Sequence, residues 1–200
     1  GRTAKWLGCG TSHACAILDD DSVKCWGGNW VGQLGLGDTI VRGDEADEMG
    51  DNLPRVDLGT GRTAKWLGCG TSHACAILDD DSVKCWGRNM EGQLGICDRF
   101  NRGVEADEMG DNLPRLDLGT NRTAKLLSGG YFHTCAILDD DSVKCWGDNG
   151  YGQLGLGDSS DRGDDEDEMG DNLPRVDLGT GRTAKSLSSA RFFTCAILDD

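Results

Sequence analysis

The sequence lacks any apolar run long enough to cross a bilayer, which excludes a helical membrane span. Hydrophobic residues make up 37% of its 200 residues, and no stretch reaches the roughly 18 apolar residues that a span needs. No N-terminal signal peptide is visible, although the chain opens inside a repeat and a leader could have been lost. We therefore expect no membrane partner.

The sequence also lacks the motifs of common catalytic chemistries. It contains no phosphate-binding loop of the Gly-x-x-x-x-Gly-Lys-Ser/Thr type and no His-Glu-x-x-His zinc motif. The segment Gly10–Ala14, Gly-Thr-Ser-His-Ala, lacks the second glycine of a nucleophile elbow. Ser12 and His13 are adjacent, so on a strand their side chains point to opposite faces. We predict that the chain is not an enzyme and needs no cofactor.

Basic residues are scarce: 20 Lys and Arg stand against 35 Asp and Glu, a net charge of −15. Such a charge repels phosphate backbones, so we expect no nucleic-acid partner. The acid is concentrated once per repeat, as in Gly43–Asp51 and Gly163–Asp171. A charge run of this kind is typical of a solvated loop. A cation site is the alternative, but the Asp-x-Asp-x-Asp-Gly spacing of a calcium loop is absent.

Glycine is abundant, with 31 residues against 3 prolines, which indicates many turns between short elements. The chain is an internal repeat: Gly1–Gly27 is identical to Gly61–Gly87. A third copy begins at Asn121, and a fourth begins at Gly181. We therefore expect one repeat array with units at 1–60, 61–120 and 121–180 and an incomplete unit at 181–200.

Each unit contains four short segments typical of β-strands. In the first unit they are Thr3–Gly8, His13–Leu18, Val23–Trp26 and Arg55–Gly59. No segment of 11 residues or more shows a helical period. The pattern predicts an all-β fold whose units are four-stranded antiparallel sheets, as in the blades of a β-propeller.

The units resemble a known repeat. His-Ala-Cys-Ala-Ile-Leu, a turn, Val-Lys-Cys-Trp-Gly and then Gly-Gln-Leu-Gly, at 13–35 and again in the next two units, is similar to the regulator of chromosome condensation repeat. The resemblance implies a seven-bladed β-propeller. Seven units of this length need roughly 420 residues, so the chain resembles three blades plus an incomplete fourth. Open blade edges would then invite self-association.

The cysteines recur in pairs, with nine residues between the two members, within each predicted hairpin. If Asp19–Asp21 form a three-residue loop, Ile17 faces Val23 and Cys15 faces Cys25. This register predicts disulfides at Cys15–Cys25, Cys75–Cys85 and Cys135–Cys145; buried free thiols and a metal site are the alternatives. Oxidised pairs favour an extracellular or secretory location, and reduced pairs a cytoplasmic one.

Zinc is considered because Cys9, His13, Cys15 and Cys25 are potential ligands within one unit. The position of Cys9 becomes Gly129 and then Ser189, and that of His13 becomes Phe193 in the last unit. A structural metal site would not lose its ligands while its unit is otherwise retained. We predict no metal.

The positions that change between units lie in three connections, whereas the frame stays fixed. Loops that vary over a rigid repeat frame are where binding surfaces form; drift at exposed positions is the alternative. Aromatic residues and Met are enriched at interfaces. The predicted partner-binding residues are therefore Trp30, Val31, Met90, Glu91, Tyr131, Phe132, Tyr151 and Phe100.

These observations predict a non-catalytic platform for protein–protein interaction. The acidic loops favour a basic protein partner. The founding member of the family that the chain resembles is a guanine-nucleotide exchange factor for a small GTPase, which also docks on chromatin. Nucleotide exchange on a small GTPase is therefore the alternative function, whereas the charge of −15 disfavours chromatin.

Overall fold

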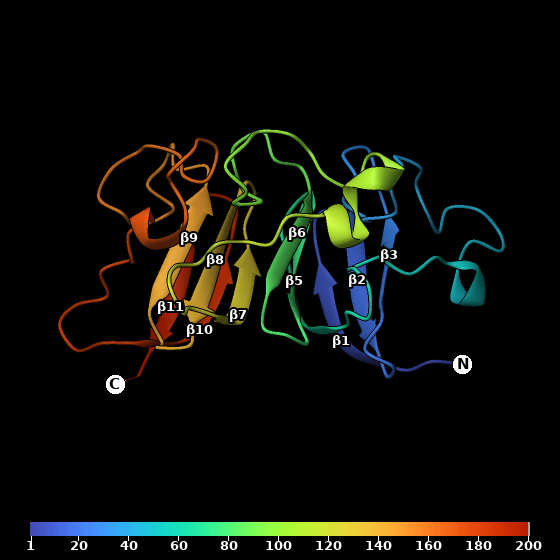
Figure 1. Cartoon of the computed structure of the whole chain (residues 1–200), viewed down its shortest axis with the longest axis horizontal. Coiled ribbons are helices and arrows are strands. Elements are labelled where there is room, and N and C mark those ends of the chain that lie inside the picture. The colour runs from blue at the N-terminus through green and yellow to red at the C-terminus, as the bar shows by residue number, and fades with distance from the viewer. Residues whose placement is uncertain (200) are drawn as a thin grey trace.

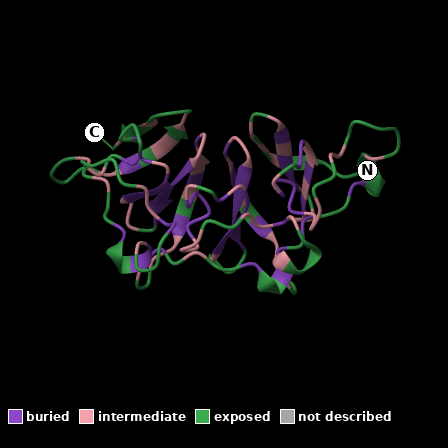
Figure 2. Cartoon of the chain, turned by 90° about the horizontal axis from the view of Figure 1, so that it is seen from above, coloured by how far each residue is buried: buried purple, intermediate pink, exposed green. Residues whose placement is uncertain are grey.

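The computed structural model describes residues 1–199; Asp200, the last residue of the expected fourth unit, lies outside the described residues. Three three-stranded antiparallel sheets and one two-stranded sheet stand in a row. Figure 1 shows them side by side in chain order, and Figure 2 shows them from above, fanned along an arc with buried residues between them. The structure confirms an all-β chain and is consistent with part of a propeller, so we call each sheet, with the segment that follows it, a blade.

The strands recur at equivalent places in every blade. The first blade holds β1 (Ala4–Cys9), β2 (His13–Leu18) and β3 (Val23–Gly27). The second and third hold β4 (Ala64–Cys69), β5 (His73–Leu78), β6 (Val83–Gly87), β7 (Ala124–Gly129), β8 (His133–Leu138) and β9 (Val143–Gly147), and the last sheet holds β10 (Ala184–Ser189) and β11 (Thr194–Leu198). Four short 3₁₀ turns lie in the connections: η1 (Gly50–Asn52), η2 (Ala106–Glu108), η3 (Gly110–Asn112) and η4 (Gly170–Asn172). Within residues 1–199 no helix is long and apolar enough to cross a bilayer.

The turn between β2 and β3 has the predicted length and sets the predicted register. Asp21 adopts a φ of 61°, the left-handed conformation that closes a three-residue hairpin loop. The Asp20 carboxylate accepts hydrogen bonds from the backbone N and the hydroxyl of Ser22, at 3.3 and 2.6 Å. Cys15 consequently faces Cys25 across the ladder.

The fourth strand expected at Arg55–Gly59 does not form, so the complete blades are three-stranded. This segment makes one ladder-like contact, from the Val56 nitrogen to the Val23 oxygen at 2.9 Å. Pro54 has no N–H to donate, and the Asp57 carboxylate accepts the Gly59 nitrogen at 2.9 Å. Two of its carbonyls bond the next blade instead: Asp57 O accepts from Gly110 N at 3.1 Å, and Leu58 O accepts from Lys84 Nζ at 3.1 Å. The segment expected to be a strand is therefore an irregular connection that is hydrogen-bonded to the next blade.

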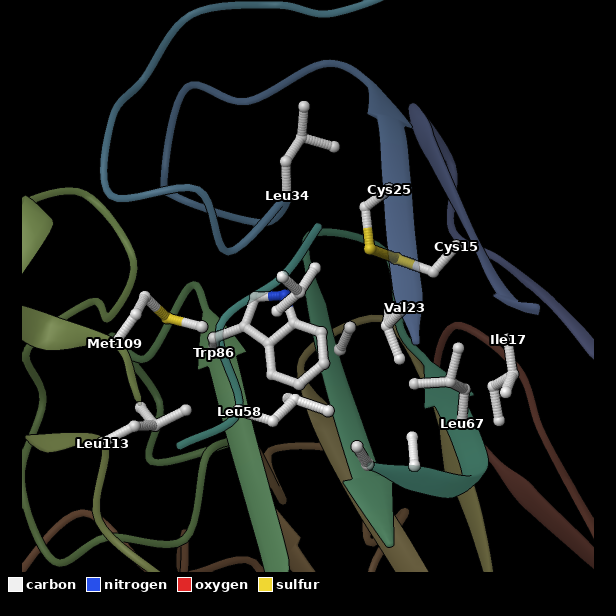
Figure 3. Packing of buried hydrophobic residues seen from close by; sticks show 14 of the residues in the cluster. Cys15, Ile17, Val23, Cys25, Leu34, Leu58, Leu67, Trp86, Met109 and Leu113 are labelled. Carbon is white, nitrogen blue, oxygen red and sulfur yellow. A yellow bond between two sulfur atoms is a disulfide. The ribbon is translucent and has the colours of Figure 1, made fainter. Parts of the chain in front are cut away.

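Trp86 lies at the centre of the interface between the first two blades (Figure 3). Its ring is fully buried, and its indole Nε1 donates to the Gln33 carbonyl at 3.2 Å. Side chains from both blades pack around it, among them Cys15, Ile17, Val23, Cys25, Leu34, Leu58, Leu67, Met109 and Leu113. Trp146 repeats the bond with the Gln93 carbonyl at 3.1 Å. The tryptophan of one blade and the leucine of the preceding one therefore fill the layer between blades.

The fixed glycines permit close approach between blades. A Cβ on Gly32, whose φ is +78°, would lie 2.6 Å from the carbonyl carbon of Gly103 in the next blade. A Cβ on Gly35, at φ +65°, would lie 2.8 Å from Nε1 of Trp86. Any side chain at either position would force the blades apart, which explains why the Gly-Gln-Leu-Gly segment is repeated so strictly.

The acidic segment is an ordered insert rather than a wholly solvated loop. The Glu48 carboxylate accepts backbone hydrogen bonds from Gly43 and Glu45, at 2.7 and 3.2 Å. In the second blade the same insert buries Met109, which is 6% exposed, against the preceding blade. Its equivalent in the first blade, Met49, is 43% exposed. The insert therefore belongs to the inter-blade interface, and the first blade presents that interface uncovered.

Candidate protein-binding surface

The variable connections lie together at one end of the sheets. The β1–β2 connection meets the segment after β3 there, because the Gly28 nitrogen donates to the Ser12 oxygen at 2.8 Å. The bond recurs in the next two blades, from Arg88 to Ser72 and from Asp148 to Phe132, both at 2.9 Å. Neighbouring blades are also hydrogen-bonded to each other at this end: the Thr71 nitrogen donates to the Gly130 oxygen at 3.0 Å. We call it the loop face: residues 10–12, 28–31, 70–72, 88–91, 130–132, 148–151 and 190–192.

Fixed polar residues hold the loops of this face in one shape. The buried side chain of Asn29 donates to the Asp38 carbonyl at 2.8 Å and accepts from the Leu34 nitrogen at 2.9 Å. The side-chain oxygen of Gln33 accepts from the Val31 nitrogen at 3.0 Å. The same bonds recur around Asn89 and Asn149. Since the backbone is fixed in this way, changes at the variable positions alter the surface and leave the frame unchanged.

Arg88 and Phe132 join the variable segments of the second and third blades. The Arg88 guanidinium lies over the Phe132 ring, 4.4 Å from its centroid. Glu91 holds the guanidinium through two hydrogen bonds of 2.8 and 3.1 Å. The Phe132 ring in turn contacts Tyr131, with centroids 4.1 Å apart. Two of the three variable sets therefore form one continuous surface across the interface.

The cluster continues into the last sheet through Phe192. Its ring lies 4.5 Å from Tyr151 and 6.3 Å from Tyr131, centroid to centroid. The Arg191 guanidinium lies over both the Tyr131 and Phe192 rings, at 4.5 and 4.8 Å. Tyr151 is 73% exposed. We call Arg88, Tyr131, Phe132, Tyr151, Arg191 and Phe192 the aromatic cluster.

Other predicted residues lie apart from this cluster. Trp30, 67% exposed, folds back over Gly28, so a Cβ at Gly28 would lie 2.7 Å from its ring. Met90 and Phe100 are also exposed. Among residues 1–199, neither Trp30 nor Phe100 is in a ring–ring or cation–π contact. The binding role of all eight predicted residues stays a prediction.

Sequence analysis missed three members of the cluster: Arg88, Arg191 and Phe192. Each occupies a variable position on the loop face, and this was the available signal. Their importance lies in the stacking of Arg on aromatic rings of a neighbouring unit, as in Arg88 over Phe132 and Arg191 over Tyr131. Contacts of this kind depend on how far neighbouring blades rotate, and the sequence does not reveal that.

The opposite end of the sheets is uniform and its charges are paired. Asp80, in the β5–β6 turn, pairs with Arg62 at 2.9 Å and with Arg115 at 3.1 Å. The same pattern recurs in the third blade, where Asp140 pairs with Arg122 and Arg175 at 3.1 and 2.9 Å. Because this end repeats identical residues and satisfies its own charges, it is a weaker candidate for selective binding than the loop face.

The three predicted cysteine pairs lie at disulfide-bonding distance. The Sγ atoms are 2.08 Å apart in Cys15–Cys25, 2.12 Å in Cys75–Cys85 and 2.11 Å in Cys135–Cys145. The other four cysteines are free: Cys9, Cys69, Cys97 and Cys195. Of the potential zinc ligands in the first unit, His13 and Cys15 gather with Cys69 of the next blade rather than with Cys9. Since Cys15 is bonded to Cys25, we propose no metal there.

Three segments match the family model for the regulator of chromosome condensation (RCC1) repeat: residues 7–33, 67–93 and 125–153. They span the strands and loops described above, once per blade. The chain belongs to the RCC1 repeat family. The matched segments contain Cys-Trp-Gly and end at the Gln of Gly-Gln-Leu-Gly, so they include both Trp86 and Gln33, the donor and acceptor of the inter-blade bond.

Known RCC1-type proteins match over most of this chain. It is 30% identical over 163 residues to the ultraviolet-B receptor UVR8 of Arabidopsis thaliana, covering 80% of this chain and 33% of the relative. It is 31% identical to the human probable E3 ubiquitin-protein ligase HERC4 over 74% of this chain and 13% of that protein. The chain thus spans a third or less of these relatives.

The fold is that of a solved RCC1 propeller. The crystal structure of Prp20p from Saccharomyces cerevisiae, described with its binding to Gsp1p and histones, matches with a TM-score of 0.71 at 17% identity. The match covers 96% of this chain and 43% of Prp20p. RCC1-type repeats occur broadly in proteins of interaction and regulation, and some, such as HERC4, are named as enzymes.

Proposed function

We propose that the chain is a non-catalytic platform that binds another protein through its loop face. The observation that supports this most is the exposed aromatic cluster, in which side chains from three successive units stack on one another. Tyr and Arg are among the residues enriched at interface hot spots. A prestacked cluster also loses little side-chain entropy on binding, because its rotamers are already fixed.

The histidines support a non-catalytic interpretation. Burial between blades lowers the pKa of His13 and His133 to about 4 and that of His73 to about 3. His73 and His133 are hydrogen-bonded to Thr134 and Thr194, at 2.8 and 2.9 Å. Proton transfer near neutral pH needs an accessible group whose pKa lies near 7. These residues instead serve packing.

Charge favours a basic partner. The net charge of −15 and the acidic inserts attract a basic protein at long range and make association depend on salt. The aromatic cluster would then supply the short-range contact. We therefore expect association to slow at high salt, and dissociation to depend on the cluster.

A pull-down from the source organism tests this proposal. Tyr151→Ala and Phe192→Ala each remove part of the cluster, and a lost hot spot costs about 2 kcal/mol, or roughly 30-fold in affinity. Lys65→Ala is the matched control, because its exposed ion pair with Asp81 lies at the opposite end. We expect the captured protein to be lost with both cluster variants and retained with the control. Equal capture by all three variants would refute the role of the cluster.

The alternative function is guanine-nucleotide exchange on a small GTPase. The fold likeness to Prp20p, whose structure is described with binding to Gsp1p, supports it. The two functions are separated by adding the chain to a small GTPase loaded with labelled nucleotide. Accelerated nucleotide release would favour exchange activity, and an unchanged rate would favour the non-catalytic platform.

A further inference from the structure

A free thiol lies beside a disulfide at the interface between the first two blades. The Sγ atoms of Cys15 and Cys69 and a ring nitrogen of His13 all lie within 4.8 Å of one another. Cys15, on β2, is bonded to Cys25, whereas Cys69, on β4 of the next blade, is free. A thiolate that reaches a disulfide sulfur can displace the other sulfur. The geometry therefore brings together a nucleophile and its target.

His13 is also unusual here. It is 5% exposed, and both of its ring nitrogens lack a hydrogen-bond partner. At the next two interfaces the equivalent histidines bond a threonine hydroxyl: His73 bonds Thr134, and His133 bonds Thr194. A buried polar group without a partner is costly. This interface thus holds a buried histidine without the threonine hydroxyl that its two equivalents bond.

Two substitutions between units create this arrangement. The threonine position at the first interface is Ala74, and the position of Cys69 is Gly129 at the second interface and Ser189 at the third. The first interface therefore loses a hydroxyl and gains a thiol. The other two interfaces keep the disulfide and the histidine but have no thiol at that position, so they serve as internal references.

We propose that Cys69 exchanges with the Cys15–Cys25 disulfide and forms a Cys15–Cys69 bond that joins the first two blades covalently. The Cys69 sulfur attacks the Cys15 sulfur, the Cys15–Cys25 bond breaks, and Cys25 leaves as a thiolate. Hydroxide from the solvent takes the proton of the Cys69 thiol, and the Cys25 thiolate takes a proton from water, so the protons balance. One disulfide is replaced by another, so no oxidant or reductant is consumed.

Burial keeps this exchange slow in the closed interface. Burial, with a smaller contribution from Cys9, raises the pKa of Cys69 to about 12, so little thiolate forms at neutral pH. Burial lowers the pKa of His13 to about 4, and the next histidine, His73, is likewise neutral. The titratable groups around the thiol are thus uncharged. Separation of the blades would let water into the interface, lower the pKa of Cys69 and accelerate the exchange. The Cys15–Cys69 bond would therefore form mainly in chains whose first two blades have separated.

The test uses the full chain with Cys9→Ser, Cys97→Gly and Cys195→Ser, which leaves Cys69 as the free thiol. Glycine is the residue of the other units at position 97. The starting material is the species in which peptide mapping shows Cys15–Cys25 intact. It is incubated without oxidant at pH 7 and pH 9, quenched in acid, alkylated and digested without reduction. Mass spectrometry then identifies the disulfide-linked peptides and the alkylated thiols.

We expect a Cys15–Cys69 peptide with alkylated Cys25, and an initial rate about 100-fold higher at pH 9 than at pH 7, since thiolate rises tenfold per pH unit below the thiol pKa. Cys69→Ser should abolish the product. Recovery of intact Cys15–Cys25 with all of Cys69 alkylated would overturn the proposal, as would cross-linking of Cys69 to Cys25.

A gain-of-function variant guards against a folding defect in the first set. Ser189→Cys with Thr194→Ala rebuilds the arrangement at the third interface, beside Cys135–Cys145. Ser189 is preferred to Gly129 because a Cβ at Gly129 would lie 2.4 Å from the Gly70 nitrogen. The variant should form a disulfide between Cys135 and the thiol introduced at position 189, and release Cys145. Failure to do so in a folded protein would also count against the proposal.

Discussion

The indole of Trp86 donates a hydrogen bond to the Gln33 carbonyl, 3.2 Å away across the interface between two blades. The donor belongs to the Cys-Trp-Gly segment of one unit, and the acceptor belongs to the Gly-Gln-Leu-Gly segment of the unit before it. The two most strictly repeated segments are therefore the two sides of one interface. Neither can change without the other, whereas Trp30, between the two segments in the first unit, is exposed.

Replacing equivalent tryptophans should lower the free energy of unfolding by unequal amounts. Trp86→Ala should lower the free energy of unfolding by about 3–5 kcal/mol, because it leaves a buried cavity and removes the bond to Gln33. Trp26→Ala is the matched control and should cost clearly less, since Trp26 is only half-buried. Urea denaturation of both variants measures this. Equal losses would show that the blades do not support one another.

The buried histidines predict loss of stability in acid. Burial lowers the pKa of His13 and His133 to about 4 and that of His73 to about 3, from 6.5. Their contribution is fully present above pH 6.5. Below it, the unfolded chain binds protons that the folded chain cannot, so stability falls until the folded pKa is reached, by about 1.4 kcal/mol per pH unit for each histidine.

His73→Phe tests this linkage. Phenylalanine occupies the equivalent position, Phe193, in the last unit. Between pH 6.5 and pH 5, the free energy of unfolding should fall by about 2 kcal/mol less in the variant than in the parent chain. Urea unfolding at several pH values measures this. An unchanged slope between these pH values would mean that His73 is protonated in the folded state.

The paired cysteines predict a distinct alkylation pattern. In natively isolated protein, Cys15, Cys25 and their four equivalents should resist alkylation, whereas the free Cys195 should react, because it is exposed. Each disulfide closes a short loop and should stabilise the fold by roughly 2–3 kcal/mol. Non-reducing peptide mapping checks the pairing. Alkylation of all six paired positions would assign the chain to a reducing compartment.

The uncovered faces predict association. Met49 is 43% exposed where Met109 is buried by a preceding blade, and Ile197 on β11 is 67% exposed. Exposed apolar surface and open strand edges promote self-assembly, so sedimentation velocity should show dimers or larger species. Ile197→Lys should shift the distribution towards monomer. A strictly monomeric parent chain, with slow amide exchange in 194–198, would contradict this account of the architecture.

The hairpins could be predicted from sequence because their rules are local. The repeated Asp-Asp-Asp-Ser turn fixes a three-residue loop, and the loop places Cys15 opposite Cys25. The segment Arg55–Gly59 shows where local rules fail. It has strand-like residues, but its carbonyls bond Lys84 and Gly110 of the next blade. A tertiary contact across units determines its structure, and no local pattern encodes that contact.

The candidate site was predictable in part. Variation between units identified the loops of Tyr131, Phe132 and Tyr151. The stacking of Arg191 between Tyr131 and Phe192 could not be predicted, because it depends on how neighbouring blades are placed. The same limit applies to Cys69, which lies near His13 and Cys15 of the preceding blade.

Hydrogen exchange on the captured complex tests the central proposal most directly. If the loop face binds the partner, amides in 130–132, 148–151 and 190–192 should exchange at least several-fold more slowly in the complex than in the free chain. Those in the turns at 79–82 and 139–142, at the opposite end, should be unchanged. Protection confined to those turns, with the loop face exchanging as in the free chain, would contradict the account.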